Sequence, residues 1–354
     1  MIYLYFILIL ISIIFRNSKR LYYIDIFFLF LLFAFNYENA DRHIYDDRYY
    51  YYDDEYFLNI TEPFFTGAVS ILNKLGMQLQ HFIMIVAFFF LYSLKRLIDK
   101  FTAFGCYVIA FYMLTEYFFD VVQLRYSIGL IFLYFGLVYL LSEIDRKKAV
   151  LKFLLFIVCG SLFHFSIAYY SVFALSRLMK SQHCIAFVVL FALSVGTLMS
   201  FFSEYADALS MADKVEAVED GSYMISKWGL IYIRIRILFF ETIPFILIFF
   251  ILHKKFVDDL FLTTMYKITI LLWTAIPLLF VSVEFHRAFF AMMIVIQIAL
   301  SRFMIYEKKY VLLIYGSSLL TIFSFVYDMY IKDAAFIQNN VILPVLTKNL
   351  LFYL

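Results

Sequence analysis

The chain alternates between long apolar runs and short polar segments along almost its whole length. A membrane-spanning helix needs about 20 consecutive apolar residues, with roughly 17 to 25 as the working range. On that scale the pattern predicts helices at about 1–15, 21–37, 81–98, 101–118, 124–142, 149–163, 165–179, 183–202, 229–252, 261–282, 287–305 and 309–327. We therefore predict an all-α fold, a polytopic integral membrane helical bundle of about 12 transmembrane or re-entrant helices in a single domain over 1–354.

The polar segments between these runs differ in length and charge. The short ones are basic, and they lie at 16–20, 94–100, 143–148, 177–180, 253–255 and 307–309. Two longer ones, at about 38–80 and 203–228, are rich in acidic residues. Because short basic loops stay on the cytoplasmic side, the pattern places both chain ends and both long loops on the outer face. We expect each loop to carry a short interfacial helix, the first capped by Thr61 with Pro63 in its first turn, the second over about 204–218.

The apolar run at 149–179 has basic residues at both of its ends. The charge rule would place both ends on the cytoplasmic side, which one straight helix cannot achieve. Two short helices that meet near Gly160–His164, or a re-entrant hairpin, would satisfy the rule and place His164 near the outer face. The alternative is one long tilted helix with a locally inverted charge bias.

Composition supports the membrane interpretation and narrows the chemistry. Hydrophobic residues make up 65% of the 354 residues and charged residues 16%, whereas soluble domains are about half apolar and a quarter charged. The three cysteines show no CxxC spacing, and the six histidines lack metal-ligand spacing. The sequence also contains no nucleotide-binding or hydrolase motif. We therefore predict no cofactor, no metal and no nucleic-acid partner.

Several basic residues lie inside or at the ends of the predicted helices. They are Arg125, His164, Arg234, Arg236 and Arg287. Charge at such a depth is costly and usually faces a protein interior or a polar cavity. Arginine suits phosphate, because its planar guanidinium stays charged and binds oxyanions through two bonds. Arg234 and Arg236 point about 200° apart on a helix, so at most one should face a given site.

Each of these residues also has an ordinary structural interpretation. An arginine near a helix end can extend to the lipid headgroups, and His164 can be a satisfied interior side chain. Asp120 can be a salt-bridge partner of Arg125, and Asp41 and Glu62 can be solvated charges in the first long loop. Taken together, the cations on one side of the membrane indicate an anionic headgroup ligand of phosphate or pyrophosphate type.

Four short motifs follow one another along the chain: Ala40-Asp41-x3-Tyr45 followed by Glu62-Pro63, Asp120 with Arg125-Tyr126-Ser127-Ile128-Gly129, Leu162-Phe163-His164-Phe165-Ser166, and Arg287-Ala288-Phe289-Phe290. Their order and spacing resemble those of the EpsG-like (Wzy-type) polysaccharide polymerases over roughly 40–300. The chain departs from that pattern at Tyr126, where glutamine is common, and at Ala40, where glycine is common.

The resemblance implies a glycosyltransferase that joins undecaprenyl-pyrophosphate-linked oligosaccharide repeat units at the outer face of the bacterial cytoplasmic membrane. Its partners would be the lipid-linked donor and acceptor, the bilayer and a chain-length regulator protein. The leaving group is already activated, so such a reaction requires neither a nucleotide nor a metal. Competing interpretations are a polysaccharide ligase, a lipid-linked oligosaccharide flippase or other transporter, and a structural or regulatory membrane protein.

Within that family the matching positions imply roles. Arg125 and Arg287 would hold pyrophosphate, with Arg234 or Arg236 assisting, and His164 would bind or orient a group near the reacting centre. Asp41 or Glu62 would be the acceptor base, with Asp120 as the third choice. Tyr45 and Tyr126 would contact sugar.

Overall fold

The computed structural model describes residues 2–51, 62–202, 227–279, 283–306, 311–327 and 337–352, and the regular secondary structure of this part is helical apart from one isolated β-bridge between Asn36 and Asn349. Its α-helices are α1 (Ile2–Ile14), α2 (Lys19–Ala34), α3 (Arg42–Tyr50), α5 (Pro63–Lys74), α6 (Leu79–Phe101), α7 (Gly105–Leu114), α8 (Tyr117–Val122), α9 (Leu124–Ser142), α10 (Arg146–Ser161), α11 (Leu175–Leu178), α12 (Ser181–Phe202), α14 (Lys227–Phe256), α15 (Leu260–Leu272), α16 (Ala275–Leu278), α17 (Arg287–Tyr306), α18 (Val311–Val326) and α20 (Leu343–Thr347). Shorter 3-10 and π turns are η1 (Phe165–Ala174), η2 (Val283–His286), η5 (Gln338–Ile342) and η6 (Leu350–Phe352).

Every apolar range predicted from the sequence contains a helix. Four helical stretches of the described chain are long and apolar enough to cross a membrane by length and composition: Leu79–Phe101, Leu124–Ser142, Leu260–Leu278 and Arg287–Met304. Several of the other apolar helices are shorter. The all-helical fold is therefore confirmed and is consistent with a membrane protein, while the number of about 12 spans stays a prediction.

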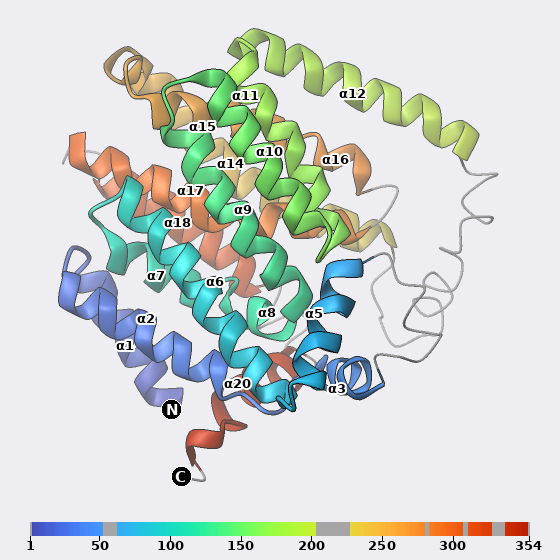
Figure 1. Cartoon of the computed structure of the whole chain (residues 1–354). Coiled ribbons are helices and arrows are strands. Elements are labelled where there is room, and N and C mark those ends of the chain that lie inside the picture. Colours follow the sequence, from blue (N-terminus) through green and yellow to red (C-terminus); the bar gives the residue numbers. More distant parts are fainter. Residues whose placement is uncertain are drawn as a thin grey trace.

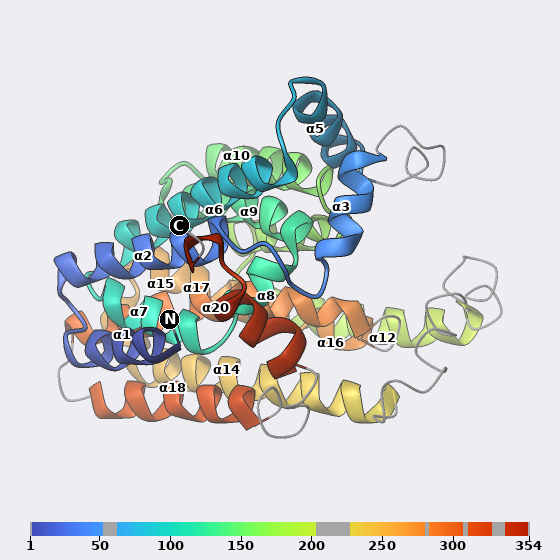
Figure 2. The same ribbon diagram turned by 90° about the horizontal axis from the view of Figure 1, so that it is seen from below.

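α9 and α17 are the most deeply buried of the long helices, and α6 packs along α9 (Figure 1). α10 and η1 pack along α9, and α14 and α18 form an outer layer (Figure 2). By contrast, α12 extends along the edge of the bundle and exposes large apolar side chains such as Leu190 and Leu193 (Figure 1). An apolar helix exposed in this way suits contact with lipid rather than with water.

The run at 149–179 is broken, as the charge rule predicted. α10 ends at Ser161, His164 adopts an extended backbone conformation (φ −152°, ψ 114°), and the chain returns as η1 and α11. η1 packs against both α10 and α9. The alternative of one long tilted helix is therefore wrong, and the break leaves His164 at the turn.

The first long loop folds into α3 and α5, which lie side by side at one end of the bundle (Figures 1 and 2). α5 was predicted, but Glu62 rather than Thr61 occupies the position before its first residue, Pro63. α3 was not predicted, because its sequence is dominated by tyrosine and charge. The second long loop, with the helix expected over about 204–218, lies outside the described residues.

The C-terminal segment closes this same end of the bundle. The side-chain amide of Asn36 donates hydrogen bonds to the carbonyls of Pro344 (3.1 Å) and Lys348 (3.0 Å). Lys348 also forms an ion pair with Glu38 at 3.3 Å. The start of the first loop is therefore fixed to residues more than 300 positions away in the sequence.

Candidate active site

The carboxylate of Glu62 is the centre of a buried charged cluster. Its side chain is only 6% exposed, and it meets three basic side chains. Arg125 Nη1 donates a hydrogen bond to Oε2, Arg48 Nη1 lies 3.9 Å from the same oxygen, and His164 Nδ1 lies 3.4 Å from Oε1. A buried carboxylate is stable only when it is paired in this way. The cluster therefore joins α3, the start of α5, α9 and the turn after α10.

Local contacts explain why Glu62 and His164 meet. The amide of Phe64 donates to the carbonyl of Leu162 (3.2 Å), and the rings of Phe64 and Phe163 pack edge to face with centroids 5.6 Å apart. These contacts attach the first turn of α5 to the end of α10. Glu62 and His164 flank the two connected segments, so the same contacts bring their side chains together.

His164 connects Glu62 to a second arginine. Its Nε2 lies 3.4 Å from Arg287 Nη1, and its ring packs edge to face on Tyr126 with centroids 5.4 Å apart. A guanidinium can only donate hydrogen bonds. Nε2 must therefore be the acceptor in this contact, which leaves the proton of a neutral ring on Nδ1, facing Glu62. The order of these side chains through the cluster is thus Arg125, Glu62, His164 and Arg287.

Two glycines make this arrangement possible by allowing a close approach of η1 to α9 and α10. A Cβ at Gly129 would lie 2.5 Å from Cγ1 and 2.9 Å from Cδ1 of Ile167, and one at Gly160 would lie 2.9 Å from Cγ2 of Ile167 and 3.1 Å from the Gly129 carbonyl oxygen. Ile167 is fully buried. Because Ile167 follows His164 by one turn of η1, this packing also sets the position of the imidazole.

The start of α17 is held by two buried tyrosines. The hydroxyl of Tyr126 donates to the carbonyl of Arg287 (2.7 Å) and lies 2.8 Å from the hydroxyl of Tyr170, which is itself 3.4 Å from that carbonyl. Tyr126 is 3% exposed, so the contact with sugar expected from the sequence does not fit its place. Its position instead suits holding Arg287 and supporting the ring of His164.

Tyr45 and Asp41 lie on and just before α3. The backbone amide of Arg125 donates to the phenol oxygen of Tyr45 (3.4 Å), and burial raises the pKa of Tyr45 above its usual value. Tyr45 is therefore a neutral phenol beside the cluster. Asp41 precedes the first residue of α3, and its side chain makes no capping hydrogen bond.

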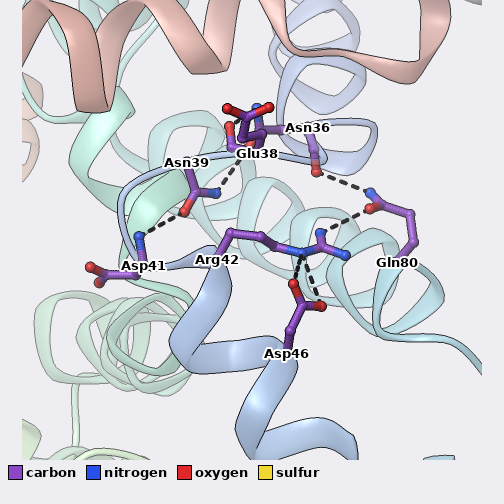
Figure 3. Close-up of polar contacts among 7 residues, drawn as sticks. All are labelled: Asn36, Glu38, Asn39, Asp41, Arg42, Asp46 and Gln80. Carbon is purple, nitrogen blue, oxygen red and sulfur yellow. Dashed lines mark hydrogen bonds and ion pairs between the residues drawn. The ribbon is translucent and has the colours of Figure 1, made fainter.

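Figure 3 shows the polar contacts that fix the chain around Asp41. The side-chain oxygen of Asn39 accepts from the Asp41 amide (3.1 Å), while the guanidinium of Arg42 engages Asp46 (3.2 Å) and Gln80 (3.0 Å). The carboxylate of Asp41 points away from that guanidinium. The loop is therefore braced by its own polar groups, with Asp41 held next to Tyr45 rather than in the Arg42 network.

The remaining predicted residues occupy different places. Asp120, in α8 between the apolar helices α7 and α9, accepts a hydrogen bond from Tyr112 (2.7 Å), whereas the partner of Arg125 is Glu62. Burial raises the pKa of Asp120 to about 7, although the Tyr112 hydrogen bond lowers it.

Of the two arginines of α14, the structure describes the side chain of Arg236 but not that of Arg234. The guanidinium of Arg236 lies over the ring of Tyr327, 5.7 Å from its centroid. The side chain of Arg234 lies outside the described part. Within that part, no group of three or more His, Cys, Asp or Glu side chains could hold a metal ion.

Sequence reasoning missed Arg48 and Tyr170. Arg48 follows Tyr45 by three residues, so on a helix the two share a face, but this signal depends on a helix that the composition of the loop did not suggest. Tyr170 lies in an apolar run, where one more tyrosine carries no signal of its own.

A family comparison decides the class of protein. The model of the EpsG family matches residues 19–346. The chain belongs to the EpsG family. A search of curated proteins and a search of solved structures each found no match. For this EpsG-family chain, membership and the apolar helices support a membrane-embedded protein with a role of the polysaccharide-polymerase type, one that uses lipid-linked substrates in the bilayer. The resemblance noted in the sequence is thereby confirmed.

Proposed function

We propose that this chain is a glycosyltransferase that joins undecaprenyl-pyrophosphate-linked oligosaccharide repeat units into a long polysaccharide, at the outer face of the bacterial cytoplasmic membrane. The observation that carries the proposal is a chain of contacts in an EpsG-family protein: the buried carboxylate of Glu62 meets Arg125 and His164, and His164 in turn meets Arg287. It supports the proposal, because it brings side chains suited to binding pyrophosphate close to a carboxylate suited to accepting a proton.

The reaction needs two things that these side chains supply. The acceptor hydroxyl forms a bond to the anomeric carbon of the donor while the bond from that carbon to the pyrophosphate oxygen breaks. Negative charge then develops on the leaving pyrophosphate, and preorganised donors stabilise it. Arg125 and Arg287 suit this role, since each can offer two parallel hydrogen bonds to an oxyanion. Arg48 is a second arginine beside the Glu62 carboxylate that Arg125 contacts.

The proton of the acceptor hydroxyl requires a base. We assign this role to Glu62, because its carboxylate lies among the cations proposed for the leaving group and faces His164 through its second oxygen. Asp41, beside Tyr45, is the second choice. Asp120 has a pKa suited to proton transfer but is buried and held by Tyr112. A supporting contact from Arg234 or Arg236, and stacking of sugar on Tyr45, belong to the same proposal.

The test is the size-resolved profile of lipid-linked and surface glycans in a deletion strain. Loss of the long ladder, with single repeat units remaining, supports the polymerase. Full-length chains that stay on their lipid carrier would instead identify a ligase, and single units trapped on the cytoplasmic side would identify a flippase. Either of the last two results refutes the proposal.

A further inference from the structure

The residue proposed as base and the residue proposed to hold pyrophosphate are bonded to each other. Oε2 of Glu62 accepts a hydrogen bond from Arg125 and also lies 3.9 Å from Arg48. An oxygen that accepts a hydrogen bond from Arg125 and faces the positive charge of Arg48 is a poor acceptor for the proton of a sugar hydroxyl. Glu62 also holds Nη1 of Arg125, which is one of the two nitrogens of the end-on guanidinium fork.

We propose that the donor pyrophosphate displaces Glu62 from Arg125 and Arg48, and that this exchange frees the carboxylate to accept the proton of the acceptor hydroxyl. The inference rests on the proposed function and adds an order of events. In the exchange the pyrophosphate oxygens take over the guanidinium N–H bonds. The acceptor oxygen then bonds to the anomeric carbon, its proton passes to Oε2, and the electron pair of the broken bond leaves with the pyrophosphate.

Relative exposure supports the direction of the exchange. The side chains of Arg125 and Arg48 are 25% and 19% exposed, whereas that of Glu62 is 6% exposed. A ligand that arrives from outside therefore reaches the arginines before it reaches the carboxylate. A pyrophosphate carries more charge than one carboxylate and offers several oxygens to the planar guanidinium fork, so it competes well for the same donors.

The carboxylate can turn without disturbing the fold around it. Glu62 precedes the first turn of α5, but its side chain makes no capping hydrogen bond there. Its other oxygen faces His164 Nδ1 at 3.4 Å. Loss of the Arg125 bond therefore leaves the carboxylate beside His164 and leaves the start of α5 held by the Phe64–Leu162 backbone hydrogen bond.

The experiment compares binding of farnesyl pyrophosphate to the purified full-length chain and its variants in detergent, with farnesol as the uncharged control. The substitution Glu62→Gln removes the negative charge that competes with pyrophosphate and keeps nearly the same side-chain shape. We therefore expect this variant to bind farnesyl pyrophosphate about tenfold more tightly than wild type. The same variant should lose polymerisation. Arg125→Ala should weaken binding, and in the double variant the gain from Glu62→Gln should disappear. Glu38→Gln, which removes a carboxylate paired with Lys348, is the matched control and should bind as wild type does.

Glu62→Asp provides a second measure if Glu62→Gln folds poorly, since it keeps the charge but shortens the reach to Arg125. It should bind farnesyl pyrophosphate with an affinity between those of wild type and Glu62→Gln. Specific binding by wild type that Glu62→Gln leaves unchanged or weakens would refute the exchange alone. No specific binding of farnesyl pyrophosphate by wild type or any variant would refute the proposed function, and the exchange with it.

Discussion

The substitution Gly129→Ala should displace His164 indirectly, because it alters no charged side chain. The added Cβ would lie 2.5 Å from Cγ1 and 2.9 Å from Cδ1 of the fully buried Ile167, distances that real Cβ atoms do not tolerate. Because α9 is long and packed along most of its length and Ile167 is fully buried, we expect Ile167 to move together with η1. Overpacking of this kind costs about 1–3 kcal/mol.

The effect on activity should exceed the effect on stability. η1 begins directly after His164, so its displacement changes the 3.4 Å distances from His164 to Glu62 and to Arg287. A misplacement of about 1 Å in a reacting arrangement can reduce a rate roughly 100-fold. We therefore expect Gly129→Ala to give mainly short glycan chains, measured by size-resolved glycan profiles at matched membrane abundance of the protein.

Two further variants test the reasoning. A Cβ at Gly196 in α12 would meet no atom within 4 Å, so Gly196→Ala should leave chain length unchanged. Combining Gly129→Ala with Ile167→Ala removes the clashing atoms, so the double variant should be more stable by about 1–3 kcal/mol than the sum of the single costs predicts. Normal long chains from Gly129→Ala, or strictly additive costs in melting experiments, would refute the argument.

Three other predictions concern single side chains. Arg287→Ala should slow polymerisation about 100-fold or more, because it removes a donor proposed for the leaving group, and a variant rate within threefold of wild type in a reconstituted assay would contradict this role. Tyr170→Phe should lower the free energy of unfolding by about 0.5–1.5 kcal/mol through loss of its hydrogen bond to Tyr126, and an unchanged melting curve would argue against that bond. Burial raises the pKa of Asp120 to about 7 in the folded chain, so its contribution to stability is complete below about pH 4 and is lost as the pH rises through 7. Asp120→Asn keeps an acceptor for Tyr112 and should therefore raise the melting temperature more at about pH 8 than at about pH 5, whereas an equal change at the two pH values would disprove the assignment.

Much of the fold followed from the spacing of apolar residues. Bilayer thickness imposes a length on apolar runs, so the ranges of α6, α9 and α17 were predicted to within a few residues. The basic segments at both ends of 149–179 also predicted the break at His164, because charge placement restricts which ends can share a side of the membrane. α3 was not predicted, since its aromatic and charged residues show no apolar periodicity.

The residues of the site were easier to predict than their partners. The sequence singled out Arg125, His164 and Arg287, because a charged side chain next to hydrocarbon is energetically costly. The structure brings all three into one cluster. Asp120 was weighed as the partner of Arg125 because it is near in sequence. The actual partner, Glu62, lies 63 positions away, and it reaches Arg125 only because α5 is fastened to the end of α10.

The sequence by itself determined that this is a helical membrane protein with cations at the ends of its helices, because both properties depend on local composition and on the thickness of the bilayer. The tertiary structure alone decided which charges pair. Glycine-permitted packing of η1 against α9 sets the place of His164, and two buried tyrosines hold Arg287 beside it. Such contacts join segments that are distant in the sequence through complementary packing of their side chains. The spacing of apolar residues within one segment does not predict that packing.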